Sequence, residues 1–304
     1  MQNLTLFPFF RLIFLKWDRV MSMKYSKSLN MAFFNKEKIF IFIVIFILLN
    51  MSLYVVFFNS VYCQKGYGDF YPNAGLEFFY YIHAIGMNPY HFICLMLLLP
   101  NILSADFLSY HISHTHYPIE TRITKKAYYR DAFIKNIIYT FITILIFEIL
   151  TLLIIHFFYK PIRFNTMVYP DSKYYHAMTI LLFQNEVTNL ITFVFLTALG
   201  YSAVSSLLFS FQYVINNPFV YRCSGVIIGI LLILIPALIQ GYLPFPDLAF
   251  LIQVSNIVSL GVDKVRENPF LLSYPFVYLY AFLIYAFVSG LCFSILLKRR
   301  YRDD

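Results

Sequence analysis

Charged side chains are scarce in this sequence. Asp, Glu, Lys and Arg make up 12% of the 304 residues, whereas hydrophobic residues make up 60%. A soluble domain usually carries about 25% charged residues, so this chain could not cover a water-facing surface. The composition therefore excludes an ordinary soluble protein and predicts an integral membrane protein whose main solvent is the lipid bilayer.

Cysteine is scarce as well. The four cysteines are Cys63, Cys94, Cys223 and Cys292, and no two are closely spaced. Disulfide frameworks and cysteine-based zinc sites show characteristic short spacings, so neither is predicted. No metal ligand and no cofactor is predicted for this chain. A nucleic-acid partner is not predicted either, because in a membrane protein the distribution of the +8 net charge matters more than its sum.

Enzyme motifs are missing too. The sequence contains no Gly-x-x-x-x-Gly-Lys-Ser/Thr phosphate loop and no His-Glu-x-x-His, so the chain does not hydrolyse ATP through that loop. The segment closest to a Gly-x-Ser-x-Gly nucleophile turn is Gly200 to Val204, which lacks the second glycine. Its small residues, with Ser206, favour helix packing instead. The chain itself is therefore not predicted to be an enzyme.

Long apolar segments are what the sequence has in abundance. A membrane-spanning helix needs about 20 predominantly apolar residues, and six segments qualify: 39–58, 90–108, 133–158, 188–214, 225–243 and 275–297. The predicted fold class is an all-α polytopic membrane protein with six transmembrane helices. The segments 59–88 and 159–187 would be loops on one side of the membrane. Residues 247–260 are apolar but too short to span, which predicts a re-entrant helix, and 262–272 could form a second one.

Basic residues fix the expected orientation. Of the 23 Lys and Arg residues, 17 fall on the side that holds both termini and 6 on the other. Cytoplasmic segments carry the excess of Lys and Arg, so both termini are predicted to be cytoplasmic in a multi-pass plasma-membrane protein. The predicted divisions are a leader at 1–38, a six-span domain at 39–297 and a basic tail at 298–304.

The leader has its own pattern. Aromatic and aliphatic residues alternate with basic ones between Phe7 and Arg19, which predicts an amphipathic helix on the membrane surface. A start of the natural protein at Met21, Met23 or Met31 is the alternative.

Two polar features stand out in or beside the spans. His111, His114 and His116 lie at the cytoplasmic end of the second span, where a solvated helix end or a metal site would each fit. Glu148 lies near the middle of the third span. A carboxylate at that depth costs roughly 2.5 kcal/mol or more. It is either a residue of a substrate cavity or proton pathway, or an interhelical hydrogen-bonding partner of Asn50, Thr192 or Gln212.

The segment from His116 to Asn136 is basic and amphipathic and continues into the third span. Pro118 suits a helix start, and charged residues share the segment with Ile119, Ile123 and Ala127. The pattern fits an anchor on anionic lipid headgroups or a docking surface for a cytoplasmic partner.

Together these features resemble the permease subunits of ABC exporters of the type-2 permease family. The resemblance covers about residues 33–302 and consists of the layout plus the basic segment Glu120 to Tyr129. It implies a second permease copy or a homologous permease, and separate cytoplasmic ATPase subunits that hold ATP and Mg²⁺. It implies a pathway along the dimer interface, lined by the first, second and fifth spans. The implied ATPase-coupling residues are Glu120, Thr121, Arg122, Lys125, Lys126, Tyr128 and Tyr129.

The sequence therefore predicts an exporter permease that moves a hydrophobic or amphipathic substrate, such as a peptide, a drug or a lipid. A secondary transporter or channel is the alternative, and it would show intramembrane charge and discontinuous helices. A membrane-embedded enzyme is the third hypothesis, and it would need polar residues that converge at one membrane depth.

Overall fold

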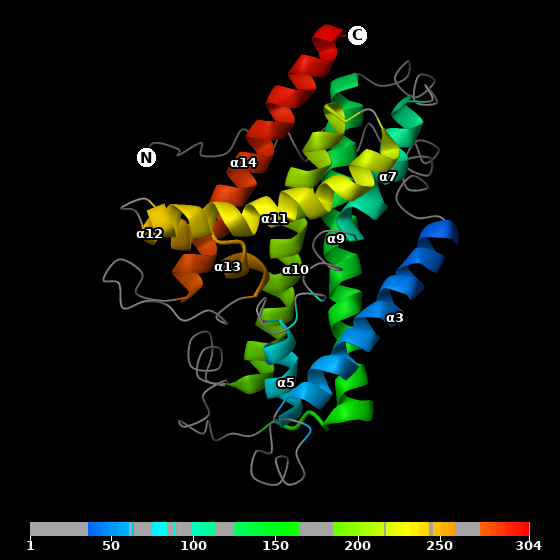
Figure 1. Ribbon diagram of the computed structural model, residues 1–304. Helices are drawn as coiled ribbons and strands as arrows, with labels where there is room; N and C mark the ends of the chain where they lie inside the picture. The colour runs from blue at the N-terminus through cyan, green and yellow to red at the C-terminus, as the bar shows by residue number, and fades with distance from the viewer. Residues whose placement is uncertain are drawn as a thin grey trace, which may run out of the picture.

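The computed structural model is a bundle of helices (Figure 1). It describes residues 36–60, 63, 74–83, 88, 91, 99–112, 125–164, 185–215, 217–242, 246–259 and 274–303. Every element in these ranges is helical. The predicted surface helix of the leader, residues 116–124 of the basic segment and the short helix at 262–272 lie outside the described residues.

Five helices are long and apolar enough to cross a membrane. They are α3 (Lys36–Asn59), α9 (Lys125–Ile154) with its continuation η3 (Ile155–Tyr159), α10 (Glu186–Ser210), α11 (Pro218–Tyr242) and α14 (Tyr274–Asp303). They match the first, third, fourth, fifth and sixth predicted spans to within a few residues at most ends. The all-α class is thus confirmed for the described residues, and the five apolar helices have the length and composition of membrane spans.

The second predicted span is described only in part. Helix α7 (Leu99–Ile112) covers its second half with 14 residues, which is too short to cross the hydrocarbon layer alone. Residues 92–98 lie outside the described part of the chain, so the count of six spans stays a prediction.

Helix α10 is the centre of the bundle. In its most apolar stretch 72% of the residues are buried, against 33% or fewer in the other four candidate spans. It packs along α9 and α14. Asn136 and Thr140 of α9 both contact the Ser205 hydroxyl of α10, each at 2.9 Å. Short polar side chains that let helices approach and then bond across the contact are typical of membrane bundles.

The ends of α3, α9 and α14 sort into two groups, whereas α11 runs across these helices (Figure 1). Near one end of the bundle Tyr128 and Tyr129 of α9, Phe209 of α10 and Leu297 of α14 share one apolar cluster. The basic starts and ends of α9 and α14 therefore lie on the same side. At the other end the ring of Phe57 in α3 contacts Phe78 and Tyr159. This grouping is what the charge-based topology requires.

The predicted outer loop at 59–88 contains a buried helix, which the sequence did not indicate. Helix α5 (Ala74–Ile82) buries all of its side chains except Tyr81, which is partly buried. Its sequence, Ala-Gly-Leu-Glu-Phe-Phe-Tyr-Tyr-Ile, is predominantly apolar, with Glu77 as its one charged residue, and a helix buried nearly all round belongs inside the protein or the membrane. It packs against α3 and η3, and so enters the bundle as a half-helix.

A second short helical segment follows α11, as predicted for residues 247–260. It consists of α12 (Pro246–Leu251) and α13 (Ser255–Val258). Ile257 and Val258 are fully buried, and α13 packs on α10 and α14. Figure 1 shows this pair beside α14, at the far end of α11 from α7. The burial of these helices is consistent with the predicted re-entrant segment. Together they are too short to cross the membrane.

Gly200 lets α13 approach α10, and its replacement should destabilise the fold. A Cβ at this position would overlap the carbonyl group of Ile257. We expect Gly200→Ala to destabilise the bundle by about 1–3 kcal/mol through overpacking. Thermal unfolding in detergent, followed by circular dichroism, measures the effect. Gly290→Ala is the matched control, because nothing lies within 4 Å of a Cβ there. Equal melting of the two variants would contradict the packing of α13 on α10.

Candidate functional site: a buried His–His–Glu cluster

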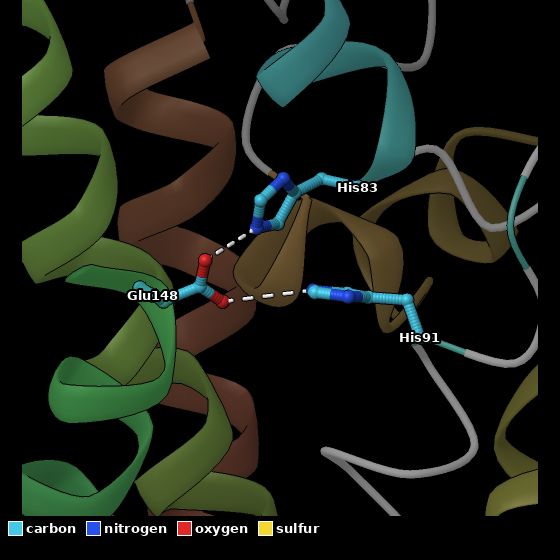
Figure 2. A group of neighbouring side chains, drawn as sticks. All are labelled: His83, His91 and Glu148. Atoms are coloured by element: carbon cyan, nitrogen blue, oxygen red, sulfur yellow. Dashed lines mark hydrogen bonds and ion pairs between the residues drawn. The ribbon is translucent and has the colours of Figure 1, made fainter. Parts of the chain in front are cut away.

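Glu148 lies inside the bundle, and its partners are two histidines. Its residue surface is completely buried. It sits 11 residues before Tyr159, the last residue of η3, which corresponds to a depth of about 16 Å along the helix. Figure 2 shows His83 and His91 approaching it, one imidazole to each carboxylate oxygen. The Asn50, Thr192 or Gln212 partners suggested by the sequence are not its bonding partners among the described contacts.

His83 makes the shorter of the two contacts. Its Nε2 lies 2.8 Å from Oε2 of Glu148. It directly follows α5, and its Nδ1 lies 2.7 Å from the carbonyl oxygen of Phe79, one turn back along that helix. The backbone of α5 thus fixes the ring orientation, and the half-helix carries the imidazole to the depth of Glu148.

His91 approaches the other carboxylate oxygen. Its Nε2 lies 3.7 Å from Oε1 of Glu148, which is close enough for an ion pair but too long for a hydrogen bond. The Asn88 side chain accepts a hydrogen bond from the backbone N–H of His91 at 3.2 Å. The rings of His83 and His91 meet edge to face with centroids 4.8 Å apart.

Two further segments hold this cluster in place. Ser259, just after α13, donates its hydroxyl proton to the carbonyl oxygen of His83 at 2.6 Å. Phe193 of α10 packs edge-on against the His83 ring at a centroid distance of 5.0 Å. The segment after α5 and the segment after α13 therefore meet directly at His83, although 176 residues separate their bonded positions.

The three side chains could hold a metal ion. One donor atom each from His83, His91 and Glu148 lies within 4.8 Å of the other two, and all three residues are buried. The two histidines lie close together in the sequence, whereas Glu148 lies 65 positions after His83. The sequence offered Glu148 as a candidate from its depth, but it offered no signal for the histidines. His83 stood in the predicted outer loop 59–88, and His91 stood at the start of the second predicted span.

The predicted coupling residues lie elsewhere. Glu120, Thr121 and Arg122 are outside the described residues, as are His114 and His116 and the side chain of His111. Lys125 begins α9, and Lys126 is exposed in its first turn. Tyr128 and Tyr129 are buried, with Tyr128 stacked on Phe107 of α7. Their role in docking stays a prediction, and the structure gives the two tyrosines a place in the apolar cluster at this end of the bundle.

One hollow in the structure is separate from the cluster. It measures about 390 Å³ and lies between the ends of α3 and η3, with lining residues that include Asn50, Tyr54, Phe58 and Phe158. Phe58 and Phe158 are exposed on the outside of the bundle, where lipid would cover them. None of the lining residues belongs to the His–His–Glu cluster.

No protein-family model, curated protein or solved structure matches this chain. The fold and the cluster together define the class as an α-helical membrane-embedded protein with a buried polar centre. Its activity has to be argued from the arrangement of its own residues.

Proposed function

We propose that this chain is the permease subunit of an ATP-driven exporter, working in the plasma membrane with both termini in the cytoplasm. The observation that carries the proposal is the gathering of the basic ends of α9 and α14 at one end of the bundle, while a short helical pair interrupts the chain between α11 and α14. This layout is the one that the resemblance to type-2 exporter permeases implies. ATP and Mg²⁺ would be held by separate ATPase subunits.

A second copy, or a homologous permease, would complete the pathway. Helices α3 and α11 expose most of their apolar side chains, and both contact α7. Ser104 of α7 and the Tyr221 hydroxyl of α11 share a 2.6 Å hydrogen bond. Helix α7 thus adjoins both α3 and α11, which agrees with a pathway lined by the first, second and fifth spans. Their apolar surfaces suit a hydrophobic or amphipathic substrate.

Reversing the charge at the start of α9 should separate the permease from its ATPase. We expect the double variant Lys125→Glu/Lys126→Glu to lower co-purification of ATPase subunits from the native host at least about tenfold, since charges at an interface rim steer association. Quantitative mass spectrometry of the tagged chain measures the loss.

The control makes the same change of charge at the other end of the bundle. Lys160→Glu/Arg163→Glu alters two residues just after η3, and ATPase recovery should stay at the wild-type level. Failure of the wild-type chain to recover any ATPase subunit would contradict the exporter proposal. Equal recovery with both double variants would contradict only the docking assignment.

A secondary transporter is the second candidate, because the structure supplies a feature that it needs. Such proteins bind substrate and coupling ion near the membrane midplane, where discontinuous helices end. Here α5 and α13 are short, and the residues that follow each of them meet at His83, beside Glu148. Uptake into proteoliposomes distinguishes the two: an exporter requires ATP and its ATPase subunits, whereas a secondary transporter requires an ion gradient.

A further inference from the structure

The protons on the two ring nitrogens of His83 do not explain its contact with Glu148. A backbone carbonyl oxygen only accepts hydrogen bonds, so the Nδ1 atom that lies 2.7 Å from the Phe79 oxygen must carry a proton. In the neutral ring Nε2 then presents a lone pair. That lone pair faces a carboxylate oxygen of Glu148 at 2.8 Å. Two acceptors this close need a positive centre between or beside them, either a second proton or a cation.

The remaining atoms of the cluster point to the same need. Oε1 of Glu148 and both ring nitrogens of His91 are buried without a hydrogen-bond partner in the described part of the chain. A buried polar atom left unpaired costs about 1–3 kcal/mol, and here the unpaired atoms face one another across 3.7 Å. One extra proton on His83 would satisfy the contact with Oε2 but would leave Oε1 and His91 as they are.

A divalent metal ion would partner Glu148 and the Nε2 atoms of both histidines at once, and only Nδ1 of His91 would stay unpaired among the described atoms of the cluster. Zinc lies about 2.0–2.2 Å from imidazole nitrogen and carboxylate oxygen, so two ligands of one tetrahedral zinc ion are about 3.3 Å apart. The contacts of 2.8 and 3.7 Å bracket this separation. Two histidines and one carboxylate form a known three-residue zinc ligand set that leaves a fourth position for another ligand.

The surroundings of the cluster are those of ligands held in place. Metal-bound histidines generally donate their other ring N–H to a carbonyl or carboxylate, which fixes the tautomer and the ring. The contact from His83 to Phe79 has this geometry, and Asn88 holds the backbone of His91. The donors are imidazole and carboxylate without a thiolate, which favours zinc and its neighbours over copper(I), calcium or magnesium.

We infer that His83, His91 and Glu148 form a binding site for one zinc-class divalent transition-metal ion, through Nε2 of each histidine and the carboxylate of Glu148. The ion would tie the segment after α5 to the middle of α9. This site stands apart from the proposed export function, because metal content can be measured without any transport assay.

Metal analysis of the purified full-length chain tests the site. We expect elemental analysis to find about one zinc-class ion per chain and a chelator to remove it. Added Co²⁺ should then give the strong visible bands of a four- or five-coordinate site, and Zn²⁺ should abolish them. X-ray absorption of the zinc-loaded wild-type chain should show imidazole and carboxylate ligands without sulfur. These readouts need no variant to fold.

Matched variants then assign the ligands. His91→Gln and Glu148→Gln should each reduce metal occupancy at least about tenfold at equal free zinc, with circular dichroism and gel filtration as checks on folding. His156→Gln is the control, since His156 is exposed in η3 and should leave occupancy unchanged. A wild-type chain that neither carries nor takes up metal would overturn the inference. So would a sulfur ligand, or an equal loss with His156→Gln.

Discussion

Replacing Glu148 with leucine should destabilise the protein by about 3 kcal/mol. The change removes the charged partner of two buried imidazoles, and breaking a buried pair from one side typically costs about 3–5 kcal/mol. We place the value at the low end of this range, because leucine nearly fills the volume that the glutamate side chain leaves. The free energy of unfolding is measured by circular dichroism in mixed micelles, as the share of a denaturing detergent is raised.

Glu148→Gln separates stability from function at the same position. A glutamine amide can donate to the unprotonated Nε2 of His83, so this variant should retain much of the stability that leucine loses. It carries no charge, however, and cannot exchange a proton. If Glu148 serves a cavity or proton pathway, ATP turnover of the assembled exporter should change in the glutamine variant. Normal turnover would favour the hypothesis that Glu148 only bonds helices together.

Phe193→Ala should also lower the free energy of unfolding substantially. Phe193 is completely buried, and its ring contacts those of Phe79, Tyr80 and His83. Truncating a buried phenylalanine costs about 3–5 kcal/mol in water-soluble proteins. Lipid already solvates apolar groups in the unfolded reference state, so part of that cost is missing here. We expect a loss of about 2–3 kcal/mol in the same unfolding assay.

Phe195→Ala provides the matched control for this variant. Phe195 lies two residues further along α10 and is 49% exposed at the outside of the bundle. The same truncation there removes the same atoms but leaves a space that lipid can fill. We expect a loss below about 1 kcal/mol. Similar losses at both positions would contradict the central position of α10 and the support that Phe193 gives to His83.

The long helices were predictable, and the reason is physical. A segment that faces lipid must be continuously apolar and must satisfy its backbone internally, so α3 and α11 are visible in composition alone. Their boundaries differ from the predicted ones where polar residues continue the helix. Lys38, for example, was assigned to the leader, yet it is buried in α3 and donates to the carbonyl oxygen of Leu103 at 2.6 Å.

The short helices were harder to predict. The apolar run at 247–260 is too short to span, and that mismatch predicted the segment that forms α12 and α13. Helix α5 gave no comparable signal, because its nine residues lie in a stretch rich in tyrosine, proline and asparagine that resembles a surface loop. Its burial depends on contacts with α3 and η3, which only the tertiary structure supplies.

Of the three residues of the candidate site, the sequence predicted one. Glu148 stood out because a carboxylate within a span is costly. A polar partner was one of two hypotheses for it, and the partners named for it differ from His83 and His91. His83 and His91 could not be assigned, since their distance from Glu148 along the chain carries no periodic signal. The convergence at one depth that a transporter or a membrane-embedded enzyme would need therefore became visible only when α5 was placed inside the bundle (Figure 2).

A double-mutant cycle on His83 and Glu148 tests the buried cluster most directly. The free energies of unfolding are compared for the wild type, His83→Leu, Glu148→Leu and the double variant, with His156→Leu in place of His83→Leu as the distant control pair. We predict a coupling energy of about 1–3 kcal/mol. The double variant should lose less stability than the two single variants lose together. Losses that add to within about 0.5 kcal/mol would contradict the placement of His83 beside Glu148.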